Sequence, residues 1–254
     1  PGAAFARLAP VRHATEESKK ERHMHKTQYT LLFLLGGIPA YKVYADEFVS
    51  AAGGKHASIA VLAQTRAIWE NRKAEITEPW IERGVSRFSP ITPGENGILD
   101  PQPALATLKT ATGILICGGD TPTNQRLFAS DSIGALIQER YRSGIPVAGI
   151  SAGALTTLEV CQLPQSETGA AELQVVRGLG LASGFVIGVH FTEWNALPEV
   201  IAVMAKTKTA IGYGIDEPAC LVCENGAVAH VLGKSVYRIV MTDFAAQSTQ
   251  VQPL

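Results

Sequence analysis

The chain has 254 residues, of which 46% are hydrophobic and 18% are charged, and its formal net charge is −1. A chain of this length can bury a core without disulfides or a metal, and it fits one large α/β domain or two small ones. The near-neutral charge excludes a strongly basic surface for nucleic acid or a membrane, and no apolar run is long enough for a transmembrane helix. We therefore expect neither nucleic acid nor a membrane among its partners.

The first 28 residues are polar and basic, and the apolar run "YTLLFLLGGIPA" (29–40) follows them. Signal peptides have the same order of regions, but this apolar run is short and ends in a Gly-Gly loop, which favours a buried first strand. We predict a flexible tail over 1–28, with His13, His23 and His25 on its surface, and a single α/β domain over 29–254.

Short apolar runs alternate with longer amphipathic runs up to residue 160. Strands are predicted at 30–35, 57–64, 85–91, 113–119 and 145–150, and helices at 39–54, 67–84, 100–111, 121–144 and 151–160. Pro79 predicts a break or kink in the second helix. This alternation is typical of a parallel sheet covered by helices on both faces, a three-layer sandwich. Ligands bind such sheets at the carboxyl ends of the strands, where the loops 36–39, 118–122 and 151–154 are expected.

The pattern changes after residue 184. A strand is predicted at 184–191, a helix at 192–207, further strands within 210–233 and a last strand at 235–241. Asn225-Gly226 is a strong two-residue turn signal and predicts a C-terminal β-hairpin.

The four cysteines are too few for a disulfide framework and favour a reducing compartment; they are Cys117, Cys161, Cys220 and Cys223. Cys220 and Cys223 are spaced like a metal or redox motif, but "PACLVCENG" has the pattern of a strand, on which residues three apart face opposite sides. We predict buried free thiols, no metal, no cofactor and a cytoplasmic location, with secretion left open.

The segment "GISAG" (149–153) matches G-x-S-x-G between a predicted strand and a predicted helix, the context of a nucleophile elbow. Glycines let the backbone turn sharply, so that the Ser151 oxygen projects from the sheet edge. The amide of Ala152 is then a candidate donor to an oxyanion. The alternative is a Gly-rich turn that packs closely or holds a phosphate.

A serine nucleophile needs a base, and His190 is the best-placed histidine. It ends the strand at 184–191 and is therefore expected at the ligand-binding edge, the same sheet edge as Ser151, whereas His56 precedes a strand and His230 lies within one. The alternative for His190 is a cap on the next helix.

The spacing does not identify the acid that orients the base. Glu193, Asp216 and Glu217 all lie near strand ends. A second oxyanion donor is expected in "ICGGDTPTN" (116–124), from the amide of Gly119 or Asp120. The alternative for that segment is an ordinary Gly-rich loop.

Four segments occur in the order seen in a known family. They are "CGGDTPTN" (117–124), "GISAGAL" (149–155), "GVHFTEWNAL" (188–197) and "GYGIDEPACLV" (212–222). Over roughly residues 30–240 the chain resembles the cyanophycinase and dipeptidase E family of serine peptidases. The resemblance implies a class I glutamine amidotransferase-like fold, with serine in place of the cysteine nucleophile.

The resemblance implies a triad of Ser151, His190 and Glu217, and it thereby selects Glu217 among the three acids. This chain order differs from the serine–acid–histidine order of α/β-hydrolases, in which Glu159 or Glu172 is the rival acid. It also implies a small peptide or amide substrate and no cofactor. Because the family includes dimers, a homodimer is compatible with it.

The chain departs from cyanophycinases at three places. No arginine occurs in "HFTEWNALPEV" (190–200), Gly188-Val189 stands where they have Asp-Gln, and Thr121 stands where they have Gln. Cyanophycin itself is therefore not the expected substrate. Trp194 and Asn195, with Thr121, are candidates for the substrate pocket, the alternative for the first two being helix packing.

The sequence thus predicts a serine hydrolase that cleaves a peptide or related amide bond. One alternative is a dipeptidase E-like enzyme with an aspartyl preference, for which Arg126 is the nearest arginine to the Gly-Gly-Asp turn. Another is a non-catalytic amidotransferase-like binding module. Esterase activity would use the same triad.

Overall fold

The computed structural model describes residues 29–254. The predicted flexible tail, with its three histidines, lies outside the described residues. Within them, no helix combines the length and apolar character that crossing a membrane requires.

The larger of the two main sheets has seven strands in the order β11-β10-β1-β5-β4-β2-β3. The strands from β1 to β3 in this order are parallel, and β10 and β11 are antiparallel additions at one side. Their bounds are β1 Leu31–Leu35, β2 Ser58–Leu62, β3 Arg87–Ile91, β4 Gly113–Ile116, β5 Val147–Ile150, β10 Cys220–Glu224 and β11 Ala227–Leu232. The predicted Asn225-Gly226 hairpin is confirmed, because it joins β10 to β11 with both turn residues at positive φ.

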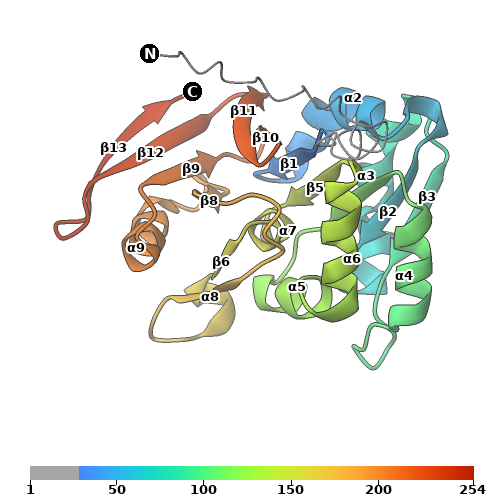
Figure 1. Ribbon diagram of the computed structural model, residues 1–254, viewed down its shortest axis with the longest axis horizontal. Coiled ribbons are helices and arrows are strands. Elements are labelled where there is room, and N and C mark those ends of the chain that lie inside the picture. Colours follow the sequence, from blue (N-terminus) through green and yellow to red (C-terminus); the bar gives the residue numbers. More distant parts are fainter. Residues whose placement is uncertain (1–28) are drawn as a thin grey trace, which may run out of the picture.

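Helices cover both faces of this sheet (Figure 1). Alternate residues of β1 show why: Phe33 packs in one core cluster with the aromatic side chains of α2 and α3, whereas Leu32 packs in the opposite cluster with α4, α5, α6 and α7. The helices are α2 Tyr41–Ala51, α3 Arg66–Ile81, α4 Pro101–Thr110, α5 Thr121–Phe128, α6 Asp131–Arg142 and α7 Ala152–Thr157. Short 3₁₀ turns, η1 (Ile38–Ala40) and η2 (Gly54–His56), flank α2. The predicted three-layer α/β fold is confirmed.

A second sheet has the order β13-β12-β9-β8. It is built from β8 (Val186–Val189), β9 (Ile211–Ile215), β12 (Val236–Asp243) and β13 (Ser248–Pro253). α9 (Leu197–Thr207) packs on it through a separate core that includes Val200 and Met204. The expectation that His190 lies at the same sheet edge as Ser151 is therefore wrong, because β8 belongs to this second sheet.

Several element boundaries differ from the predictions. α3 continues through Pro79 to Ile81. α7 ends at Thr157, and Val160 already begins β6 (Val160–Leu163), which pairs with β7 (Gln174–Arg177) across the short helix α8 (Gln165–Thr168). α9 begins at Leu197, because Asn195 has a positive φ and Pro198 occupies its first turn.

The cysteine prediction is confirmed for the described residues. All four thiols are free and buried, and burial raises the pKa of Cys117, Cys161 and Cys223 to about 12. Cys220 and Cys223 belong to opposite core clusters, one on each face of the large sheet. These thiols are therefore core residues.

Candidate active site

Ser151 lies at a sharp turn between β5 and α7. Its backbone has φ 52° and ψ −121°, a conformation that few non-glycine residues adopt. The flanking glycines are required by close approach: a Cβ on Gly149 would lie 2.6 Å from the Gly153 carbonyl oxygen, and one on Gly153 would clash with the Ile116 carbonyl oxygen. The G-x-S-x-G segment therefore forms a strained strand–helix elbow, the conformation expected from the motif.

The His190 imidazole lies between Ser151 and Glu217. Ser151 Oγ is 2.8 Å from His190 Nε2, and His190 Nδ1 is 2.8 Å from Glu217 Oε1. The tautomer that fits a carboxylate acceptor carries its proton on Nδ1, which then donates to Glu217 and leaves Nε2 to accept the Ser151 O–H. His190 is only 9% exposed, which removes most of the water that would compete for these contacts.

The other two candidate acids hold the backbone around this imidazole. Asp216 Oδ1 accepts a hydrogen bond from the Thr192 amide at 2.9 Å. Glu193 Oε1 accepts one from the Glu217 amide at 3.2 Å. Each carboxylate thus connects the turn after β8, which carries His190, to the turn after β9, which carries Glu217. We call this pair of bonds the double clasp.

The Gly-Gly-Asp turn after β4 lies directly against Ser151, since a Cβ on Gly118 would be 3.3 Å from the Ser151 Cβ. Gln64, which sequence reasoning missed, holds this turn. Its Oε1 accepts the Asp120 amide at 3.1 Å, and its Nε2 donates to the Asp120 carbonyl oxygen. Because the Asp120 amide is occupied, Gly119 is the better oxyanion donor of the two candidates.

The amides of Gly119 and Ala152 have no hydrogen-bond acceptor within residues 29–254. Ala152 follows Ser151 in the chain, and Gly119 lines the 250 Å³ cavity together with Ser151, so both amides are candidate donors to a developing oxyanion. Gly119 adopts φ +139°, and a Cβ there would lie 2.5 Å from Gln64 Oε1. A glycine is therefore required at this position by its conformation and by its contact with Gln64.

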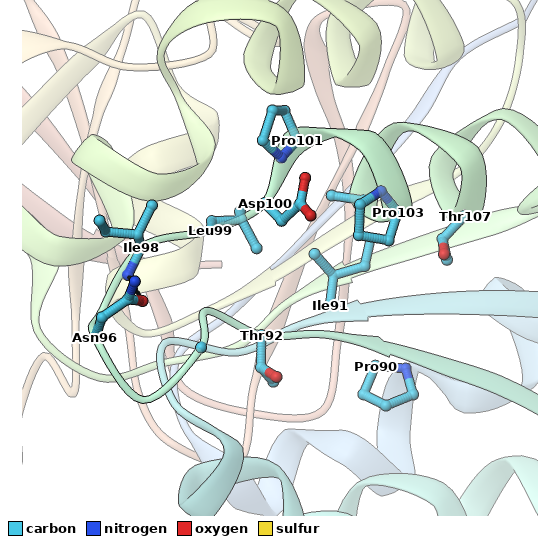
Figure 2. Close-up of a pocket in the computed structure, with 12 residues that line it drawn as sticks. Pro90, Ile91, Thr92, Asn96, Ile98, Leu99, Asp100, Pro101, Pro103 and Thr107 are labelled. Atoms are coloured by element: carbon cyan, nitrogen blue, oxygen red, sulfur yellow. Dashed lines mark hydrogen bonds between the residues drawn. The ribbon is translucent and has the colours of Figure 1, made fainter.

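Two cavities meet at Ser151. One, of about 420 Å³, extends towards β6, α8 and α9, and the other, of about 250 Å³, extends towards α2 and α3 and includes Arg72. A third hollow of about 560 Å³ lies between β3 and α4 (Figure 2). It is lined mainly by proline, aliphatic and small polar side chains and contains none of the candidate catalytic residues, so we place the candidate site at the first two.

The three predicted pocket residues all line the 420 Å³ cavity. Thr121 is buried, and its amide donates to Glu167 Oε2 at 2.7 Å. Trp194 is 64% exposed and its indole stacks on the His190 ring, so the helix-packing alternative does not describe it. Asn195 is exposed in the turn before α9. Arg126 is exposed on α5 and lines neither cavity at Ser151.

Sequence reasoning missed several polar residues of this cavity, among them Gln162, Glu167 and Glu199. Burial raises the pKa of the Glu167 carboxyl, and the Asp120 charge raises it further, against the effect of the hydrogen bond from the Thr121 amide. Burial also raises the pKa of Glu199, and the negative charge of Glu167 adds to this effect. No group of three or more His, Cys, Asp or Glu side chains within 29–254 is arranged to hold a metal ion.

An α/β sandwich with a serine on a strand–helix elbow, next to a histidine and a carboxylate, is the arrangement of serine hydrolases. Comparison with known proteins defines the class more closely. The model of peptidase family S51 matches residues 97–231. The chain belongs to this family and is a serine-type peptidase.

Several cyanophycinases have sequences similar to that of this chain. A cyanophycinase of Trichormus variabilis is 28% identical over 222 residues, which are 83% of this chain and 73% of that protein. A cyanophycinase of Synechococcus elongatus is 23% identical over 229 residues, which are 87% of this chain and 71% of that protein. The resemblance inferred from the sequence motifs is thereby confirmed.

Two solved structures have the same fold. A peptidase from an acI-B1 Actinobacterium superposes with a TM-score of 0.66 at 19% identity, covering 91% of this chain and 96% of its own. A putative peptidase E protein from Listeria monocytogenes EGD-e gives 0.58 at 16% identity, covering 82% and 100%. At these identities the likeness establishes the fold.

Proposed function

We propose that this peptidase cleaves a peptide or related amide bond of small peptides through a Ser151–His190–Glu217 triad and an acyl-enzyme intermediate. The observation that carries the proposal is the continuous pair of 2.8 Å contacts from Ser151 Oγ through the imidazole to Glu217. A serine is a weak nucleophile unless a base accepts its proton, and this geometry supplies the base and its orienting acid.

In the acylation step, His190 Nε2 accepts the Ser151 hydroxyl proton while Oγ bonds to the substrate carbonyl carbon. The carbonyl oxygen becomes an oxyanion, to which the amides of Gly119 and Ala152 donate. Glu217 stabilises the imidazolium through Nδ1–H. The carbon–nitrogen bond then breaks, and the leaving amine takes the proton from Nε2.

In the deacylation step, a water molecule gives one proton to Nε2 and its oxygen bonds to the acyl carbon. The bond from carbon to Ser151 Oγ breaks, the product leaves as a carboxylic acid, and Oγ recovers the proton from His190. The base therefore returns to its starting state, and no cofactor is required by the balance of protons and electrons.

The residues that line the two cavities favour small peptides over cyanophycin as the substrate. The two relatives described above are named cyanophycinases, but no arginine follows His190 before α9, and none lines the 420 Å³ cavity. Arg126 lines neither cavity at Ser151, and Arg72 of the 250 Å³ cavity is paired with Glu75 at 3.0 Å. An aspartyl dipeptidase therefore has less support than a peptidase of other small peptides.

The test is covalent labelling with a fluorophosphonate probe, together with hydrolysis of a library of dipeptides and β-aspartyl peptides. The folded chain should label at Ser151 and cleave at least one library member. Ser151→Ala should lose labelling, and its kcat should fall by about 10⁴-fold or more. Ser166→Ala, which removes another serine of the same cavity, is the matched control and should label normally. Absence of labelling in folded protein would instead support the non-catalytic binding module.

A further inference from the structure

The 250 Å³ cavity beside the candidate nucleophile has mainly apolar walls. Tyr41, Ile76 and Ile150 form part of these walls, and each is no more than 4% exposed. Ile38 and Ile68 also line the cavity but are only half-buried, so apolar surface remains accessible to a ligand. Pockets for drug-sized ligands measure roughly 300–1,000 Å³, so this smaller volume suits a single side chain.

The walls of this cavity carry little charge. Among the described residues that line it, Arg72 is the one side chain with a fixed charge, and it pairs with Glu75 at 3.0 Å. Burial raises the pKa of Tyr41 well above its usual value and that of Cys117 to about 12, so both side chains stay neutral. A charged substrate group would lose its hydration here without gaining a free partner, whereas an aliphatic group loses no hydrogen bonds to water.

The leaving residue of a substrate is expected on this side of Ser151. In acylation the leaving amine takes its proton from His190 Nε2, which is 2.8 Å from Ser151 Oγ. His190 lines the 250 Å³ cavity together with Ser151, and it does not line the 420 Å³ cavity. The nitrogen of the scissile bond, and the side chain of the residue that carries it, are therefore expected at the 250 Å³ cavity.

The two half-buried isoleucines provide the apolar surface that a ligand would cover. Ile38 begins the 3₁₀ turn η1, and Ile68 lies in the first turn of α3, so the cavity walls come from separate segments. Both residues pack against the same core cluster, which holds them in place from behind. Each methylene group that moves from water into such a site favours binding by about fourfold.

We propose that the 250 Å³ cavity is a specificity subsite that binds an aliphatic side chain of the residue on the amine side of the scissile bond. The inference rests on the function proposed above, because it takes Ser151 as the nucleophile and His190 as the group that protonates the leaving amine. Ile38, Tyr41 and Ile68 are the contacts of that side chain. The substrates are then small peptides whose leaving residue is aliphatic, such as leucine or norvaline.

Hydrolysis of matched peptides tests the subsite. One series keeps the acyl residue fixed and varies the leaving residue through alanine, 2-aminobutyrate, norvaline, leucine and asparagine. A second series makes the same changes in the acyl residue. In the first series kcat/KM should rise by about fourfold per methylene group from alanine to norvaline. Leucine should exceed asparagine, which has a similar shape and a polar end, by about tenfold or more.

Variants of α3 connect this preference to the cavity. Ile68→Asn places a polar group on the wall and should reduce the leucine-to-asparagine ratio severalfold, whereas Ile68→Val should retain most of it. Ile81→Asn makes the same polar substitution at an exposed position of the same helix, outside the cavity, and should leave the ratio unchanged. Equal cleavage of leucine and asparagine peptides, with Ser151 still required, would overturn the subsite and leave the proposed function intact. A ratio that Ile68→Asn changes only in the acyl series would also overturn it.

Binding measured without catalysis separates the two proposals in the other direction. On the full chain carrying Ser151→Ala, a titration followed by NMR should show N-acetylleucinamide bound at least fivefold more tightly than N-acetylasparaginamide. Adding Ile68→Asn should abolish the difference and adding Ile81→Asn should not, with thermal unfolding as the check on folding. Equal affinities would contradict the subsite even if no peptide were cleaved, whereas selective binding without labelling of wild-type Ser151 would contradict only the peptidase mechanism.

Discussion

The indole of Trp194 lies almost flat on the imidazole of His190, with ring centroids 3.9 Å apart and an interplanar angle of 19°. The Trp194 amide donates to the His190 carbonyl oxygen at 2.8 Å, so a tight turn brings the two rings together. An aromatic face stabilises a neighbouring cation by about 0.5–1 kcal/mol at an exposed site. The indole is thus placed to stabilise the imidazolium that the proposed mechanism forms at His190.

Trp194→Ala should lower kcat/KM by about two- to fivefold, the equivalent of that cation–π energy. Trp194→Phe retains an aromatic face and should recover most of the loss. The measurement is steady-state hydrolysis of one peptide by both variants. Equal losses in the Ala and Phe variants would show that the indole acts through substrate contact or bulk instead.

The double clasp predicts a positioning role for Asp216. The side chain is only 5% exposed, and its Oδ1 accepts the Thr192 amide. Asp216→Ala leaves that amide without its acceptor, which should cost about 1–3 kcal/mol of unfolding free energy. It should also lower kcat by roughly tenfold or more, because the turn that carries His190 loses its connection to the turn that carries Glu217.

Asp216→Asn is the matched control, because its side-chain oxygen still accepts the Thr192 amide. It should keep most of the stability and activity. Urea unfolding and steady-state kinetics measure the two effects on the same preparations. If Asp216→Ala unfolds earlier but retains wild-type kcat, the clasp supports the fold without positioning the imidazole.

Gln64 is predicted to position the oxyanion donor. Its side chain makes two hydrogen bonds to the backbone of Asp120: Oε1 accepts from the amide, and Nε2 donates to the carbonyl oxygen. Gln64→Ala should release the turn and lower kcat by about 10- to 100-fold with a small change in KM, because an oxyanion interaction acts mainly in the transition state. Gly119→Ala should be at least as damaging, since its Cβ meets Gln64 at a φ of +139°.

Gln64→Glu retains the acceptor for the Asp120 amide and loses the donor to its carbonyl oxygen. Its kcat should lie between those of wild type and Gln64→Ala. A rise in KM with unchanged kcat for Gln64→Ala would place Gln64 in ground-state binding, and the oxyanion assignment would then need another donor.

Much of the fold and the candidate nucleophile could be predicted from the sequence, because their signals are local. Continuous apolar strands such as β1 are buried on both faces, and the glycines around Ser151 are needed for close backbone approach. Glu217 could not be chosen from spacing. Its selection over Asp216 and Glu193 rested on the resemblance, since all three acids lie at one pair of turns.

The segments that were not predicted are short and lack a periodic pattern of hydrophobic residues. β6, α8 and β7 have four residues each, so the segment that carries Gln162 and Glu167 gave no regular pattern. β13 is mostly exposed and polar, and it is ordered by pairing with β12 alone. Gln64 was missed because its role depends on a turn more than fifty residues away.

Glu167 and Glu199 of the 420 Å³ cavity should make the free energy of unfolding depend on pH. Burial and the neighbouring charge of Glu167 raise the pKa of Glu199, and burial and Asp120 raise that of Glu167. An acid whose pKa is higher in the folded state favours folding in its neutral form. Its stabilising effect is complete below the unfolded-state pKa of about 4.3 and is lost as pH rises through the folded-state value.

Glu199→Gln should therefore raise the Tm at pH 8, by about 2 °C for an effect near 1 kcal/mol, and the advantage should disappear by pH 4. Glu172→Gln removes an exposed charge of the same kind and should leave the Tm unchanged at both pH values. Thermal unfolding followed by circular dichroism makes the comparison. A lower Tm for Glu199→Gln at pH 8 would mean that a donor already satisfies this carboxylate, because the substitution would then weaken an existing charge-assisted hydrogen bond.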